Sequence, residues 1–159
     1  MTTVDAVRRL AAGVPDPELP VLTIEDLGIL RDVHADGAGR IVVDLTPTYS
    51  GCPAVEAIRE DVERTLRSGG FEDVTVRMVM SPAWTTDWMT ETGRQKLREH
   101  GVAPPRERAP GVRPLQLAIV CPRCGSARTD EVSHFGSTQC QAIRHCLDCR
   151  ETFPHFKEH

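Results

Sequence analysis

The chain has 159 residues, of which 40% are hydrophobic and 26% are charged, a composition that excludes a disordered protein. Its net charge of −4 argues against a dedicated nucleic-acid-binding protein, which normally needs a basic face. No apolar run approaches the ~20 residues that span a membrane, and the N-terminus lacks the pattern of a signal peptide. We therefore expect a cytoplasmic protein with reduced cysteines that binds neither nucleic acid nor membrane.

The first predicted element is a helix that Thr2 or Thr3 caps and Gly13 ends. Its apolar residues recur at helical spacing, at Val4, Val7, Leu10 and Ala11. Three prolines then keep residues 14–20 extended. We interpret Asp16 and Glu18, within this stretch, as turn and surface carboxylates. An acid/base pair is the weaker alternative.

A short helical turn at residues 23–28 is followed by two predicted strands, 29–35 and 40–45, around a hairpin turn at 36–39. A helix over 53–67, a strand over 74–80 and a helix over 91–100 come next. Trp84 and Trp88 are expected to cover the edge of the core, with docking on another protein as the alternative. The order α-β-β-α-β-α predicts one α+β domain over residues 1–101.

Cys52 lies in the segment that joins the second strand to the following helix, Thr46-Pro47-Thr48-Tyr49-Ser50-Gly51-Cys52-Pro53-Ala54. We expect Cys52 at the N-cap, where free N–H groups and the helix dipole would favour a thiolate. The alternative is a small buried hydrophobic residue. A catalytic nucleophile would need a histidine such as His34, which only folding could bring near.

Residues 102–114 hold four prolines and mixed charges, which predicts a stiff, solvated linker. The remaining residues, 115–159, carry five basic and five acidic side chains, a balance that is a poor match to nucleic acid. Residues 115–120 are predicted as a strand that leads into the first of two Cys-x-x-Cys motifs.

These motifs are formed by Cys121 with Cys124 and by Cys146 with Cys149. Two such turns can bring four thiolates to one tetrahedral site, for which Zn²⁺ is preferred, and the metal would contribute folding energy to so small a module. Four thiolates also suit an iron–sulfur cluster, and a redox dithiol is a weaker interpretation. Cys140, His134 and His145 are alternative ligands.

Residues 4–101 resemble the small α+β domain of iron–sulfur cluster assembly and targeting factors. The resemblance rests on Asp16-Pro17-Glu18, Asp26-Leu27-Gly28, and Thr46-Pro47-Thr48 followed by Gly51-Cys52-Pro53. It implies that Cys52 handles iron or a cluster. We interpret the acidic and threonine positions as local architecture.

The whole chain is also similar to the D subunits of the bacterial phenylacetyl-CoA epoxidase system, through residues 20–30, 51–53 and 135–140. This resemblance implies a role in aerobic phenylacetate breakdown, with the oxygenase and reductase subunits as partners. The sequence lacks the four-helix bundle and Glu-x-x-His pairs of a di-iron oxygenase, and the glycine-rich fingerprint of a dinucleotide-binding reductase.

The leading hypothesis is therefore a non-catalytic maturation factor, in which Cys52 is a transient ligand. Because one thiolate cannot hold a cluster alone, a second ligand would come from Cys140, a homodimer partner or the client protein. The alternative is a structural docking component of the oxygenase complex. A zinc-ribbon regulator of transcription or translation fits the acidic composition poorly.

Overall fold

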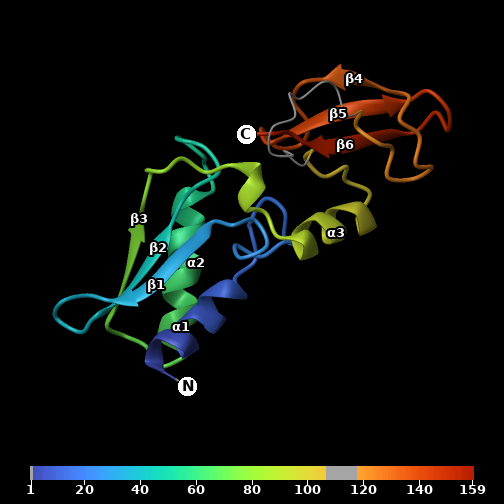
Figure 1. Ribbon diagram of the computed structural model, residues 1–159. Coiled ribbons are helices and arrows are strands. Elements are labelled where there is room, and N and C mark those ends of the chain that lie inside the picture. The colour runs from blue at the N-terminus through green and yellow to red at the C-terminus, as the bar shows by residue number, and fades with distance from the viewer. Residues whose placement is uncertain (1, 107–117) are drawn as a thin grey trace, which may run out of the picture. The chain divides into compact units, whose positions relative to one another are not determined.

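The computed structural model describes residues 2–106 and 118–159. The chain divides into two compact units, Met1–Gly93 and Arg94–His159, which Figure 1 shows in blue to yellow-green and in yellow to red. Helix α3 (Glu91–Glu99) runs across the division.

The first unit contains α1 (Thr3–Ala12), β1 (Leu30–Ala35), β2 (Ile41–Leu45), α2 (Val55–Ser68), β3 (Val74–Met78) and the short 3₁₀ helix η1 (Thr86–Trp88). The strands form one sheet in the order β1-β2-β3. β1 and β2 make an antiparallel hairpin, whereas β2 and β3 are parallel and are joined through α2 (Figure 1). The chain thus has the predicted α-β-β-α-β-α order, although most of the last helix, α3, belongs to the second unit.

Local sequence explains these elements. Thr2 and Asp5 form a capping box at the start of α1, which satisfies backbone N–H groups that the first turn leaves free. The apolar residues of α1 and α2 and those on one face of the sheet are buried. They are Val7 and Ala11 on α1, Ile58, Val62 and Leu66 on α2, and Val43 and Leu45 on β2. The other face of the sheet carries polar residues, among them Asp32, His34 and Arg77.

The Trp84 side chain belongs to the core, as predicted. It is 5% exposed, and its indole N–H donates to the Leu27 carbonyl at 2.9 Å. Leu27 belongs to a turn at residues 26–28, and in the same turn the Asp26 carbonyl accepts the Thr90 N–H at 2.9 Å. The segment that follows β3 is therefore held against this turn.

We expect Gly28→Ala to destabilise the first unit by about 2–4 kcal/mol. Gly28 has a φ of +72°, and an added Cβ would meet the Cβ of Trp88 at 2.7 Å. Gly39→Ala is the matched control, because Gly39 has a φ of +80° with open space around it and should lose only about 1 kcal/mol. Urea unfolding followed by tryptophan fluorescence measures both, since both tryptophans lie in this unit. Equal losses would show that the approach to Trp88 is unimportant.

The second unit contains a three-stranded antiparallel sheet, β4 (Thr129–Ser133), β5 (Gln141–Cys146) and β6 (Thr152–Phe156), in that order. Among the described residues of this unit, one buried apolar cluster consists of Ala103, Ile119, Cys121, Cys146 and Phe153, and Phe156 and Ala142 are fully buried as well. Two of the five residues in this cluster are cysteines, so potential metal ligands form part of the described core.

The division after Gly93 differs from the predicted domain limit at residue 101. The backbone of Ala103 pairs with β6: its N–H donates to the Pro154 carbonyl and its carbonyl accepts from the Phe156 N–H, both at 2.9 Å. Residue 103 therefore belongs to the ribbon unit and not to a solvated linker. Residues 107–114 of the predicted linker and 115–117 of the predicted strand lie outside the described residues, and residues 118–120 form no strand.

Within the described residues, the chain forms no helix with the length and apolar character needed to cross a bilayer.

Candidate functional site

Two similar turns present the four ribbon thiols. In the first, the Gly125 N–H donates to the Cys121 carbonyl at 2.9 Å; in the second, the Arg150 N–H donates to the Cys146 carbonyl at 3.0 Å. The closing residues both have positive φ, 76° at Gly125 and 64° at Arg150. Each Cys-x-x-Cys motif thus folds into a tight knuckle that points its two sulfurs in one direction.

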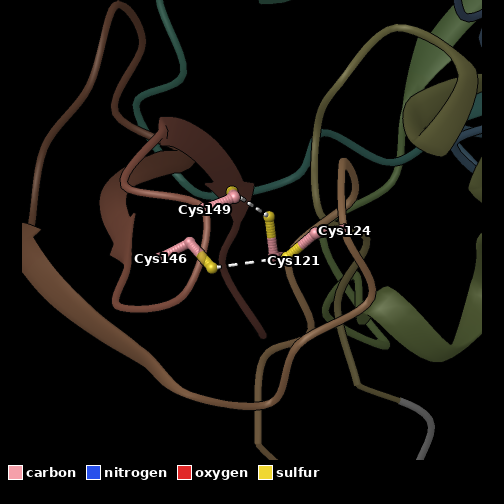
Figure 2. Close-up of side chains that lie close together, drawn as sticks. All are labelled: Cys121, Cys124, Cys146 and Cys149. Atoms are coloured by element: carbon pink, nitrogen blue, oxygen red, sulfur yellow. Dashed lines mark hydrogen bonds between the residues drawn. The ribbon is translucent and has the colours of Figure 1, made fainter.

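The four sulfurs converge, as the spacing predicted (Figure 2). Sγ of Cys121 lies 3.7 Å from Sγ of Cys149, and Sγ of Cys124 lies 3.5 Å from Sγ of Cys146. A tetrahedral ion with metal–sulfur bonds of ~2.3 Å requires sulfurs ~3.8 Å apart. The set therefore fits a single ion, and Zn²⁺ bound by these four thiolates would fasten the two knuckles together.

The thiols differ in acidity before any metal binds. The N–H groups of Cys149 and Asp148 lower the pKa of Cys146 to about 7, although burial opposes this. For Cys149 the Glu151 N–H favours the thiolate, but burial and the neighbouring thiols outweigh it and raise the pKa to about 12. Four thiolates cannot crowd together without a cation, so metal binding and proton release are coupled.

Cys140 and the two candidate histidines are not part of this cluster. Cys140 is buried, and its Sγ lies 3.0 Å from the Thr138 hydroxyl oxygen. His134 lies 3.3 Å from the Glu131 carboxylate. The described ligand set is therefore the four cysteines, and a part for Cys140 in iron handling stays a prediction.

The predicted N-cap position of Cys52 is wrong. Helix α2 begins at Val55 with Ala54 as its cap, and no side chain caps it. Before this helix the chain makes two successive turns. In the first, the Cys52 N–H donates to the Tyr49 carbonyl, and in the second the Val55 N–H donates to the Cys52 carbonyl, both at 3.2 Å. These turns delay the helix, so the capping argument for a thiolate no longer applies.

Cys52 itself is buried, as the alternative interpretation predicted, although both of its neighbours are exposed. It is 9% exposed and is flanked by the exposed residues Gly51 and Pro53. Its loop follows the carboxyl end of β2, next to the end of β3, where the Val79 N–H donates to the Leu45 carbonyl at 2.7 Å. This edge of parallel strands is a common place for sites in α/β units.

Asp16 is a turn residue as predicted, but it is buried and not on the surface. It is 6% exposed, and its carboxylate accepts the N–H groups of Glu18 at 2.9 Å and Leu19 at 2.7 Å. Burial raises its pKa despite these bonds. Asp26 likewise accepts the Thr23 N–H at 3.0 Å. Both motifs therefore make local structural contacts, as their interpretation as local architecture predicted.

Asp44 carries a pH-dependent part of the stability of the first unit. Its carboxylate accepts two hydrogen bonds from Arg77, at 2.7 and 2.8 Å, and these lower its pKa although burial opposes them. A carboxylate whose folded pKa lies below its unfolded value of 3.8 stabilises the fold above that pH. The contribution is lost as the pH falls through the lowered pKa.

We therefore expect Asp44→Asn to cost about 1–2 kcal/mol at pH 7, since Arg77 is largely solvent-exposed. The difference between variant and wild type should shrink as the pH falls below 3.8. Tryptophan-detected urea unfolding at several pH values measures it. Asp73→Asn, at an exposed carboxylate before β3, is the control and should show no such trend; a pH-independent deficit in Asp44→Asn would contradict the linkage.

Comparison with known proteins agrees with this division of the chain. Residues 5–78 match the family model of iron–sulfur cluster assembly proteins, and residues 107–157 match that of the PaaD zinc beta ribbon domain. The chain is 47% identical, over 93% of its length and 88% of the relative, to an Escherichia coli K12 protein provisionally named as the D subunit of 1,2-phenylacetyl-CoA epoxidase. It is 33% identical, over 61% of its length and 92% of the relative, to an Fe–S protein maturation auxiliary factor of Porphyromonas gingivalis.

The fold of the first unit is also found among solved structures. A DUF59 domain from Bacillus anthracis aligns over 59% of this chain and 90% of that one, with a TM-score of 0.54 and 30% identity. Fold and site thus define an iron–sulfur assembly domain joined to a four-cysteine zinc ribbon. The chain belongs to the PaaD family, the D subunits of the phenylacetyl-CoA epoxidase system.

Proposed function

We propose that this protein is a non-catalytic accessory factor that assists assembly or repair of the iron–sulfur or iron centres of phenylacetyl-CoA epoxidase components. The observation that carries the proposal is the presence, in one chain, of an iron–sulfur assembly domain and a zinc ribbon, with similarity to an epoxidase D subunit over 93% of its length. A second relative is itself named as an Fe–S protein maturation factor.

The described residues support an accessory role over an oxygenase role. A di-iron oxygenase needs paired Glu-x-x-His motifs on the helices of a bundle. The chain has one such motif, Glu131 to His134, which was missed in the prediction from sequence. It lies on β4 and the adjoining loop, so it cannot supply the two helical pairs.

In this proposal Cys52 offers one soft thiolate ligand to iron or to a cluster in transit. The ligand is a single sulfur in a loop just below the surface, which suits transfer better than storage. A client protein or a second copy of the chain would complete the coordination, and a part for Cys140 stays a prediction from the sequence. The ribbon, held by its own metal, would serve as a docking module for the oxygenase or reductase partner.

A deletion strain tests this role. Cells without the protein should still make the oxygenase and reductase polypeptides but should fail to grow on phenylacetate. Growth should return when the wild-type chain is supplied. Normal growth of the deletion strain would contradict the proposal. A failure to accumulate the oxygenase polypeptides, with the surviving partners fully loaded, would favour a structural docking role instead.

A further inference from the structure

The loop between β4 and β5 presents an aromatic side chain to solvent. Phe135 is 62% exposed, whereas the other two phenylalanines of the second unit, Phe153 and Phe156, are 5% and 1% exposed. Val132, three residues before Phe135, is 63% exposed. Two large apolar side chains within four residues thus lie outside the core of this unit. Exposed apolar side chains that gather in one place are typical of protein–protein contact sites.

Hydrogen bonds and close packing brace this loop. The Gly136 N–H donates to the Gln141 carbonyl at 2.8 Å, and the Ser133 hydroxyl donates to the Phe135 carbonyl at 2.8 Å. Gly136 also lies so close to β5 that an added Cβ would be 3.2 Å from Cδ1 of Ile143. A braced loop loses little conformational freedom when a partner binds, and such preorganisation lowers the cost of binding.

A cation lies over the exposed ring. Nζ of Lys157 is 4.4 Å from the ring centroid of Phe135 and donates to the His134 carbonyl at 2.8 Å. The rings of His134 and Phe135 make an edge-to-face contact, with their centroids 5.1 Å apart. A cation–π contact becomes stronger when it is withdrawn from water. A partner that covered Phe135 would therefore also strengthen its contact with Lys157.

The charge of Lys157 has no carboxylate partner in the part of the chain that the structure describes. Two carboxylates nearby are engaged elsewhere. Glu131 lies 3.3 Å from His134, and Glu158 accepts the Arg106 N–H at 2.9 Å. The surface around the exposed ring therefore combines apolar area with one unbalanced positive charge, which a carboxylate of a partner would complement.

We propose that Phe135 and Lys157 form the centre of the surface by which the ribbon docks on an epoxidase partner. This inference rests on the proposed function, which gives the ribbon a docking role. The partner would offer an apolar pocket that buries the phenyl ring and a carboxylate at its edge that pairs with Nζ of Lys157. An aromatic anchor that a partner buries commonly dominates the energy of an interface. A second copy of the chain fits less well, because a two-fold interface centred on Phe135 would bring two Lys157 cations together.

The purified oxygenase and reductase components of the epoxidase system, each titrated with the full-length, zinc-loaded protein, are the probes. We expect one component to bind the wild-type protein. Phe135→Ala should raise its dissociation constant about tenfold or more, as for a central aromatic anchor. Lys157→Gln removes the charge but can still donate a hydrogen bond to the His134 carbonyl, and it should raise the constant about threefold. Lys157→Arg should bind nearly as wild type does.

Val120→Ala is the matched control, because it also truncates an exposed apolar side chain of the ribbon, one that is 49% exposed. Val120 lies near the start of β4, where the Thr129 hydroxyl donates to the Ile119 carbonyl at 2.6 Å, whereas Phe135 follows the end of that strand. This variant should bind as wild type does. One zinc per chain in every variant would show that the ribbon is intact.

Equal dissociation constants for wild type and Phe135→Ala would overturn the proposal. So would the absence of binding between the wild-type protein and both components. A dimer of this chain that Phe135→Ala dissociates, with binding of the components unchanged, would assign the surface to a second copy instead. These outcomes are distinct from failure of the proposed function, which normal growth of the deletion strain would show whatever the dissociation constants are.

Discussion

Removal of the ribbon metal should unfold the second unit and leave the first unit folded. Structural zinc sites of this type contribute about 10–16 kcal/mol of apparent binding free energy at neutral pH. Because Cys121 and Cys146 belong to the buried apolar cluster of this unit, loss of the metal also disturbs that cluster. After a strong chelator has stripped the metal, limited proteolysis should cut within residues 118–159, while the first unit remains protected and its tryptophan fluorescence is unchanged.

Single cysteine variants sharpen this test. Cys146→Ser removes a fully buried ligand and should give the same proteolysis pattern without chelator. Cys140→Ser removes a buried thiol that lies outside the cluster, and it should keep one metal per chain. Equal protection of the second unit before and after verified metal removal would show that the ribbon folds without its metal.

Cys52→Ser should abolish growth on phenylacetate while leaving the protein folded. Serine replaces sulfur by oxygen at nearly the same size, but it places a hydroxyl at a position that is only 9% exposed, so the free energy of unfolding should fall by about 1–3 kcal/mol while the fold is kept. A serine hydroxyl does not ionise near neutral pH and binds iron poorly. Complementation of the deletion strain with the variant, compared with wild type at equal protein level, measures the effect.

Cys140→Ser is the control for this variant too. If it supports growth and Cys52→Ser does not, the functional thiol is Cys52. Loss of growth in both variants, with fold and ribbon metal intact, would indicate that the two thiols act on the same metal centre. Full growth with Cys52→Ser would favour the structural docking hypothesis.

Periodicity and turn chemistry predicted most of the first unit. The helical spacing before Gly13 and the Asp36–Gly39 turn are local signals, and the structure has α1 and the β1–β2 hairpin there. The start of α2 was predicted two residues early because Pro53 suits a first helical turn. The carbonyls of Tyr49 and Cys52 accept the hydrogen bonds of two turns instead, and these turns delay the start of the helix despite the preference of proline.

Sites built from local motifs could be predicted from the sequence, whereas contacts between residues far apart in the sequence could not. The four ribbon thiols could be predicted because each Cys-x-x-Cys knuckle is local and one tetrahedral ion explains both. By contrast, the pairing of Ala103 with β6 joins segments that lie far apart in the sequence, and it was missed because the nearby prolines indicated a linker.

The most direct test of a maturation role is the iron and acid-labile sulfide content of the epoxidase partners. The oxygenase and reductase would be purified without oxygen from deletion strains that carry wild-type protein, Cys52→Ser or no protein. The account predicts full loading with wild-type protein and a shortage of iron or sulfide in at least one partner in the other two strains. Fully loaded, active partners from the strain without the protein would contradict it.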